Sequence, residues 1–281
     1  MTLIRWMSRW PLWLLHALGA LAGWLAFAFS GAYRRRLWAH AGAAGASWAQ
    51  RCGAVAGAGR MLFEIPWLWL RPPGLGDWVR WEGAELLPAL LQERRGLLLM
   101  TPHLGCFEVV AQAYAERFGA QAPMTALYRP ARKPWLRELV AASRDRPGLQ
   151  AAPANLSGVR QMLRALKKGE CVGLLPDQVP PEGQGAWAPF FGRPAYTMTL
   201  ATRLIQQTGA PVVLLWGERL PWGRGYIVHV RPFAPLPPDC SPEQACEHIN
   251  RHMEALILEA PQQYLWGYNR YKGPRAQEQA S

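Results

Sequence analysis

Residues 97–108 read LLLMTPHLGCFE, a pattern typical of a buried strand, a turn and the start of a helix. Strand ends of this kind are where α/β proteins place functional loops. A carboxylate on one imidazole nitrogen fixes the tautomer and stabilises the imidazolium, so the other nitrogen can act as a general base. We therefore predict that His103 is a catalytic base, oriented by Glu108 on the first or second helical turn. The same spacing also suits a surface histidine and a glutamate favoured by the helix dipole.

From residue 95 onward, strand-like and helix-like segments alternate. The apolar patterns predict strands at residues 96–101, 123–128, 171–175, 211–218 and 225–231. Helices are predicted at residues 107–118, 134–143, 157–168, 197–207 and 242–259. Thr197 would cap its helix, with Gly209 beyond the end, and Ser241 begins a sequence that resembles a capping box. The alternation predicts an α/β fold with a mostly parallel central sheet flanked by helices.

The chain divides into four expected segments. They are an N-terminal membrane anchor at residues 1–36, a helical membrane-proximal segment at 37–94, an α/β domain at 95–272 and a polar tail at 273–281. A chain of 281 residues is long enough to bury a full core. Within the second segment, the apolar residues 61–70 are too few to span a bilayer, so we expect a core helix or a membrane-resting segment there.

The anchor is predicted from residues 11–30, which carry no formally charged side chain. A helix of this length extends about 30 Å, the hydrocarbon thickness of a bilayer. Two arginines precede the segment and three follow it at residues 34–36, which predicts that the rest of the chain faces the cytoplasm. His16, Gly19 and Gly23 weaken a membrane span, so a helix lying in the interface is the alternative.

The charge balance points to anionic partners. The formal net charge is +12 and the isoelectric point is near 10.0, which suits nucleic acid, an acidic membrane surface, phosphorylated substrates or an acidic carrier protein. The sequence has no recognisable nucleic-acid-binding motif, and its apolar N-terminal segment also disfavours a nucleic-acid partner. The five cysteines form no CxxC pair and no metal-ligand spacing, so we predict reduced thiols and no metal centre.

Polar residues follow two more of the predicted strands. Asp177 and Gln178 come directly after the apolar run that ends in Leu174-Leu175-Pro176. Because parallel strands end at one edge of a sheet, Asp177 could lie near His103, although a turn residue is equally compatible with the pattern. Arg129 follows another strand, and its guanidinium would suit a phosphate because it binds bidentately and keeps its charge.

Two further segments allow more than one interpretation. Residues 187–194 are apolar with one cation, and Phe190 and Phe191 could either pack in the core or form a wall for an acyl chain. The predicted helix at 157–168 carries basic residues at helical spacing, at positions 160, 164, 167 and 168. Such a face is usually only solvated, but it could dock an acidic carrier protein.

With these segments in order, the chain resembles the late acyltransferases of lipid A biosynthesis, the lauroyl/myristoyl transferase family of Gram-negative bacteria. The matching segments are the N-terminal anchor and, between about residues 95 and 272, PHLGCFE, LYRP, LLPDQ, APFFGRPAYT, TGAPVV and PQQYLWGYNRYK. The resemblance implies an inner-membrane O-acyltransferase whose catalytic domain faces the cytoplasm. Such an enzyme moves an acyl chain from an acyl-carrier-protein thioester to a hydroxyl of a phosphorylated glycolipid, a lipid A precursor, without a further cofactor.

The resemblance also implies roles for individual residues. His103 resembles the general base of the family and Glu108 its orienting carboxylate. Arg129 would match the arginine at the edge of the active site, and Asp177 and Gln178 would match polar substrate-binding positions.

The sequence departs from the family pattern around the histidine. Pro102, Cys106 and Phe107 stand where the family more often has Gly before the histidine and Asn-Trp before the glutamate. These departures leave a lysophospholipid or an aminolipid open as alternative acceptors. A membrane-anchored thioesterase or other hydrolase is the alternative from a different class, but the chain lacks a GxSxG motif.

Overall fold

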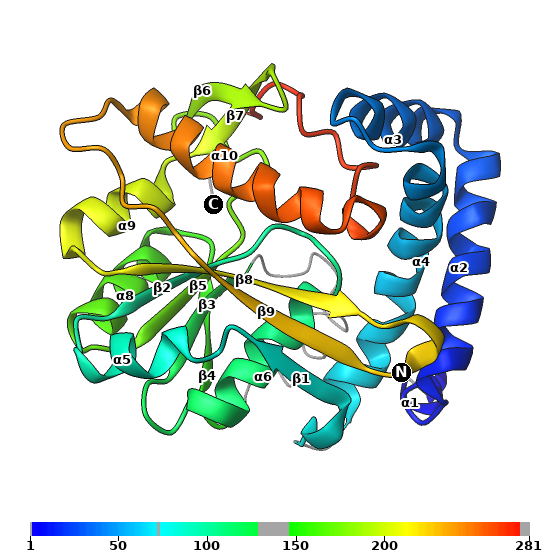
Figure 1. Cartoon of the computed structure of the whole chain (residues 1–281), viewed down its shortest axis with the longest axis horizontal. Coiled ribbons are helices and arrows are strands. Elements are labelled where there is room, and N and C mark those ends of the chain that lie inside the picture. Colours follow the sequence, from blue (N-terminus) through cyan, green and yellow to red (C-terminus); the bar gives the residue numbers. More distant parts are fainter. Residues whose placement is uncertain (1, 72–73, 129–145, 276–281) are drawn as a thin grey trace.

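A seven-stranded sheet forms the centre of the structure, a computed structural model that describes residues 2–71, 74–128 and 146–275 (Figure 1). Across the sheet the strands are β1 (Val79–Glu82), β9 (Tyr226–Pro232), β8 (Val212–Arg219), β2 (Leu97–Met100), β5 (Cys171–Leu174), β3 (Met124–Tyr128) and β4 (Leu149–Pro153). The strands from β8 to β4 run parallel, whereas β9 is antiparallel to β8 and parallel to β1. The predicted α/β fold with a mostly parallel sheet is confirmed.

Helices from before and after β2 in the chain cover both faces of the sheet (Figure 1). Before β2 they are α1 (Thr2–Met7), α2 (Leu12–Phe29), α3 (Gly31–Ala43), α4 (Trp48–Leu70) and α5 (Leu86–Gln92). After β2 they are α6 (Phe107–Phe118), α8 (Leu156–Lys167), α9 (Leu200–Thr208) and α10 (Pro242–Glu259). Short 3-10 turns are η1 (Gly76–Trp78), η2 (Pro221–Gly223) and η3 (Pro261–Gln263). The helix predicted at residues 134–143 lies outside the described residues.

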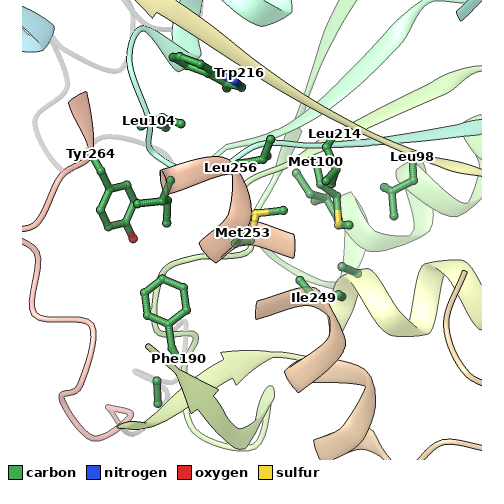
Figure 2. Packing of buried hydrophobic residues seen from close by; sticks show 14 of the residues in the cluster. Leu98, Met100, Leu104, Phe190, Leu214, Trp216, Ile249, Met253, Leu256 and Tyr264 are labelled. Atoms are coloured by element: carbon green, nitrogen blue, oxygen red, sulfur yellow. The ribbon is translucent and has the colours of Figure 1, made fainter. Parts of the chain in front are cut away.

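The central strands are apolar on both faces because helices cover both. Leu98 and Met100 of β2 belong to one core cluster, whereas Leu97 and Leu99 belong to another on the opposite face. This alternation follows from the two-residue period of a strand. Figure 2 shows the first cluster, in which three α10 side chains approach the sheet: Ile249, Met253 and Leu256.

A two-stranded hairpin lies where the sequence predicts an apolar segment and a helix start. It consists of β6 (Gly185–Phe190) and β7 (Arg193–Met198). Thr197 therefore belongs to β7, and its hydroxyl bonds to Asn250 rather than capping a helix; α9 begins only at Leu200. The predicted cap is thus wrong because strand pairing uses the backbone of residue 197. Gly209, left-handed with φ of 63°, ends α9 as predicted.

The predicted membrane-proximal segment forms a helical layer and also adds the edge strand β1 to the sheet. Ser47 begins α4 with a capping box, and this helix contains Pro66. Trp67 and Leu68 are buried, so residues 61–70 form part of a core helix, one of the two predicted possibilities. Within the described part of the chain, α2 is the one helix long and apolar enough to cross a membrane, and Figure 1 shows it alongside α4.

Candidate active site

His103 lies in the turn between β2 and α6, at the carboxyl edge of the sheet. The neighbouring strand β5 ends three residues before Asp177, and β2 and β5 pair in parallel register. Asp177 Oδ1 is 2.7 Å from Nδ1 of His103, and Asp177 Oδ2 accepts a hydrogen bond of 2.9 Å from the backbone N–H of His103. The sheet topology therefore brings together two residues that are 74 positions apart in the chain.

The Asp177 carboxylate is buried, with 2% of its surface exposed, and it also accepts a hydrogen bond from the Tyr264 hydroxyl. Burial alone raises the pKa of this carboxyl, but the charge of His103 and the hydrogen bonds from its side chain and backbone outweigh burial and hold the pKa below the ordinary value. Because an ionised carboxylate only accepts hydrogen bonds, Nδ1 carries the proton. The Nε2 atom then faces the Gln178 amide at 3.0 Å and can serve as a base.

Glu108 does not take the position that the sequence predicts for it. Of the described carboxylates, the one bonded to His103 Nδ1 is that of Asp177, whereas Glu108 Oε2 accepts a hydrogen bond of 3.1 Å from Trp69 Nε1. At the start of α6 it is the ring of Phe107 that contacts the His103 ring, with 4.8 Å between their centroids. In the structure the carboxylate on Nδ1 of His103 is therefore that of Asp177, which is buried, and the catalytic role of Glu108 stays a prediction.

A pocket of about 650 Å³ opens beside the histidine, a size suited to a small-molecule ligand. His103, Glu108 and Gln178 line the pocket, together with other polar residues that include Gln112, Asn155 and Arg203. Its surface is mainly apolar, with side chains from β3, α8, α9 and the segments next to them: Leu127, Val159, Leu163, Leu175, Leu200 and Leu204. Phe190 and Phe191 do not line the pocket; they pack in the core cluster that contains Leu98 and Met100, where Phe191 contacts Trp266. Of the two possibilities that the sequence left open for these phenylalanines, the structure shows core packing.

The turn that carries His103 is held by a buried charge network. Arg219 at the end of β8 donates a hydrogen bond of 3.0 Å to the Gly105 carbonyl and bonds with two nitrogens to the Glu64 carboxylate of α4. Gly105 has φ of 58°, and a Cβ there would collide with the Gly217 carbonyl, so glycine is required. Burial raises the pKa of Glu64, but the charge and hydrogen bonds of Arg219, aided by His16, bring it to about 2.

Glu64→Gln is expected to lower the free energy of unfolding by about 3–5 kcal/mol, because it leaves the buried Arg219 without a charged partner. Denaturant unfolding of the purified variant measures this loss. Since the pKa of Glu64 is depressed in the folded state, its contribution is present above the unfolded pKa of about 4.3 and is lost as the pH falls toward 2.

The control for this substitution is Glu85→Gln, the same change at an exposed position, which is expected to stay within about 0.5 kcal/mol of wild type. Equal stability of the two variants at neutral pH would contradict a structural role for the buried pair.

Two further predictions from the sequence concern Arg129 and metal binding. Arg129 lies outside the described residues, so its role stays a prediction. Within residues 2–71, 74–128 and 146–275, no group of three His, Cys, Asp or Glu side chains is arranged to hold a metal ion. Sequence reasoning missed Tyr264 and the pair formed by Glu64 and Arg219. The signal for Tyr264 was its place in the matching C-terminal segment, whereas the pair is 155 positions apart and has no local signal.

The fold and this edge of the sheet define an α/β protein in which a histidine, bonded to a buried carboxylate, lies beside a mainly apolar pocket. Residues 50–273 match the family described as bacterial lipid A biosynthesis acyltransferase. The chain belongs to this family.

Curated relatives support the assignment. The chain is 30% identical to the lipid A biosynthesis lauroyltransferase of Escherichia coli K12 over 222 residues, which cover 77% of this chain and 69% of the relative. It is also 30% identical to the lipid A biosynthesis palmitoleoyltransferase of the same organism over 217 residues, 76% of this chain and 68% of the relative. A lipid A biosynthesis acyltransferase of Haemophilus influenzae is 26% identical over 184 residues, 66% of this chain and 56% of the relative.

Proposed function

We propose that this protein transfers a fatty acyl chain from an acyl-carrier-protein thioester to a hydroxyl of a lipid A precursor, with His103 as the general base. The observation that carries the proposal is the position of the His103 ring, between a buried carboxylate and a largely apolar pocket of about 650 Å³. Family membership supplies the reaction class, and the pocket supplies a place for the hydrocarbon chain. The relatives named for lauroyl and palmitoleoyl transfer support a fatty acyl donor.

The proposed mechanism is direct transfer. The acceptor hydroxyl replaces the Gln178 amide at Nε2 of His103 and gives up its proton to that nitrogen as its oxygen attacks the thioester carbonyl carbon. Asp177 stabilises the imidazolium that forms. When the tetrahedral intermediate collapses, the carbon–sulfur bond breaks and Nε2 returns the proton to the departing thiolate. One ester and one free thiol are produced, and the histidine regains its starting state.

The basic surface next to the pocket supports a carrier-protein donor. Val159 and Leu163 of α8 line the pocket, and the exposed face of the same helix region carries Arg160, Arg164, Lys167 and Lys168. This exposed basic face supports docking of an acidic acyl carrier protein close to the site where its acyl chain enters. We therefore infer that the donor is carrier-bound rather than a free fatty acid.

Membership of the same family supports a proposal for the acceptor and the location. We infer a phosphorylated glycolipid acceptor, with Arg129 near its phosphate, and attachment of the protein to the bacterial inner membrane with the α/β domain on the cytoplasmic side. The apolar helix α2 and the net charge of +12 support attachment to an anionic membrane. The arginines at residues 34–36, which follow α2, support that orientation.

An acyl-transfer assay tests the proposal. Purified full-length protein is mixed with acyl carrier proteins loaded with different chain lengths and with a phosphorylated lipid A precursor, and the products are identified by mass spectrometry. An ester on the glycolipid and one free thiol per transfer are expected. Release of free fatty acid without an ester would show a hydrolase, and acylation of a lysophospholipid but not of the precursor would overturn the proposed acceptor.

Val159→Trp is expected to shift donor preference toward shorter chains, because a bulkier side chain from α8 removes space from the pocket. Each methylene accommodated in an apolar pocket changes specificity by about 10-fold or more, so the preference for the longest accepted donor over a shorter one is expected to fall by at least about that factor. Competition between two donor lengths in one reaction measures the ratio.

The matched control is Gln206→Trp, an exposed position on α9 outside the pocket, where the ratio is expected to stay at the wild-type value. An unchanged ratio in Val159→Trp would mean that the acyl chain does not occupy this pocket.

A further inference from the structure

Helix α2 has two opposite faces. Its buried residues recur at spacings of three or four and so form one stripe: Leu12, Leu15, His16, Gly19 and Gly23. This stripe packs on α4, where a Cβ on Gly59 would collide with the Gly19 carbonyl. The glycines therefore let two helix backbones approach closely along their length, and α2 is part of the folded domain rather than a detached anchor.

His16 connects this buried stripe of α2 to the charge network of Glu64 and Arg219. Its Nε2 atom lies 3.1 Å from the buried carboxylate of Glu64, which is also the partner of Arg219. Arg219 in turn bonds to the Gly105 carbonyl in the active-site turn. The residues that weaken a membrane span in the sequence are thus those that bind α2 to α4 and to the catalytic turn.

The opposite face of α2 is exposed and apolar. Its exposed large side chains are Trp13, Leu21, Trp24, Leu25 and Phe29, the last with 86% of its surface accessible. Arginines flank this face: Arg5 and Arg9 lie before α2, and residues 34–36 follow it, all of them exposed. Apolar surface between two clusters of exposed cations matches the boundary between acyl chains and anionic head groups.

A second exposed tryptophan site adjoins this face. The η2 turn packs against the first turn of α2, where a Cβ on Gly223 would collide with the backbone of Trp13. Beside that contact, Trp222 has φ of 62° and is 85% exposed, and Arg224 follows it, also exposed. An indole and a guanidinium next to an apolar helix face are the residue types found at membrane interfaces.

We propose that α2 lies in the plane of an anionic lipid bilayer, with its outer face and Trp222 inserted at the acyl-chain boundary, so that the N-terminus and the α/β domain stay on the same side. This extends the membrane attachment proposed above, on which it rests. The partner is a lipid surface that carries anionic head groups, since the flanking side chains are arginines.

A crossing helix conflicts with the packing of α2. Since α4 lies along α2, a membrane-spanning α2 would carry α4 into the hydrocarbon together with Arg60, Glu64 and the η2 turn. Charged side chains are strongly disfavoured at the bilayer centre unless they line a polar cavity. In the plane of the membrane, by contrast, the same helix keeps every contact with α4 and buries only its apolar face.

Depth measurements on the full-length protein in phosphatidylglycerol-containing vesicles test the geometry. Fluorophores are attached to single cysteines from Trp13→Cys, Leu21→Cys and Phe29→Cys, in a background with Cys52→Ser and Cys240→Ser, and are quenched by lipids brominated at known depths. All three labels are expected at one shallow depth of about 5–10 Å below the head groups. A Leu21 label near the bilayer centre, about 15 Å deep, with shallow labels at both ends would show a span and overturn the proposal.

Two controls complete this test. A label from Trp222→Cys is expected to be quenched like the α2 labels, whereas Trp187→Cys, exposed on the β6–β7 hairpin, is expected to stay unquenched. Unquenched labels on α2 and at residue 222 would overturn the proposed membrane face. None of these readouts uses acyl transfer, so they stand apart from a failure of the proposed reaction.

Sidedness is measured separately with a membrane-impermeant maleimide. In closed vesicles, Ser8→Cys before α2 and the native Cys240 before α10 are expected to be labelled from the same side. Labelling from opposite sides would overturn the proposal, whichever side the α/β domain faces.

Discussion

His103→Ala is expected to lower the rate constant for acyl transfer by about 10³-fold or more, while the protein stays folded and membrane-bound. The loss follows from the removal of Nε2, which takes the proton from the acceptor hydroxyl and returns it to the leaving thiolate, since positioned acid–base groups contribute about 10²–10⁴-fold each. The imidazole is partly exposed at the pocket, so its truncation leaves little buried void. Initial rates of ester formation at saturating acceptor measure the effect.

His248→Ala provides the matched control, because this half-buried histidine lies on α10 and bonds to the Ala234 carbonyl, outside the pocket. Its transfer rate is expected to equal that of wild type. Wild-type rates in purified His103→Ala would show that His103 is not the general base. A loss of soluble, folded protein would instead show that His103 has a structural role.

The edge of the sheet that carries the site was predictable because it follows from local patterns. Apolar runs that end in a polar residue predicted β2 and β5, and parallel pairing then placed Asp177 near His103 as one of two expected possibilities. The sequence could not rank Asp177 against Glu108 as the partner of Nδ1. That choice depends on side-chain direction at the start of α6, where Phe107 contacts the imidazole and Glu108 bonds to Trp69.

The features that the sequence did not predict are those that depend on contacts with residues far away in the chain. The short strands β1 and β4 lie at the two edges of the sheet, where one side has no strand neighbour and the apolar signal is weak. Thr197 is of a residue type that often caps helices, yet its pairing with β6 makes it part of strand β7. The ion pair of Glu64 and Arg219 joins α4 to β8, and no sequence period connects positions so far apart.

Asp177→Asn is expected to lower the transfer rate constant by about 10³–10⁴-fold, more than Glu108→Gln does. An asparagine side chain can donate to Nδ1 and so favour the tautomer with its proton on Nε2, which is the wrong form for a base; this kind of exchange costs about 10⁴-fold in a serine-protease triad. Glu108 lines the pocket and bonds to Trp69, so its substitution is expected to act mainly on the KM for the lipid substrates. A larger loss of kcat in Glu108→Gln than in Asp177→Asn would restore Glu108 as the orienting carboxylate.

The pH profile of the transfer rate separates the roles of Asp177 and Glu108 further. Because the pKa of Asp177 is lowered in the folded protein, its support of the imidazolium persists through mildly acidic pH and is lost only as the pH falls through that lowered pKa. The transfer rate constant of Asp177→Asn is therefore expected to stay low at every pH. The pH profile of Glu108→Gln is expected to keep the shape of the wild-type profile.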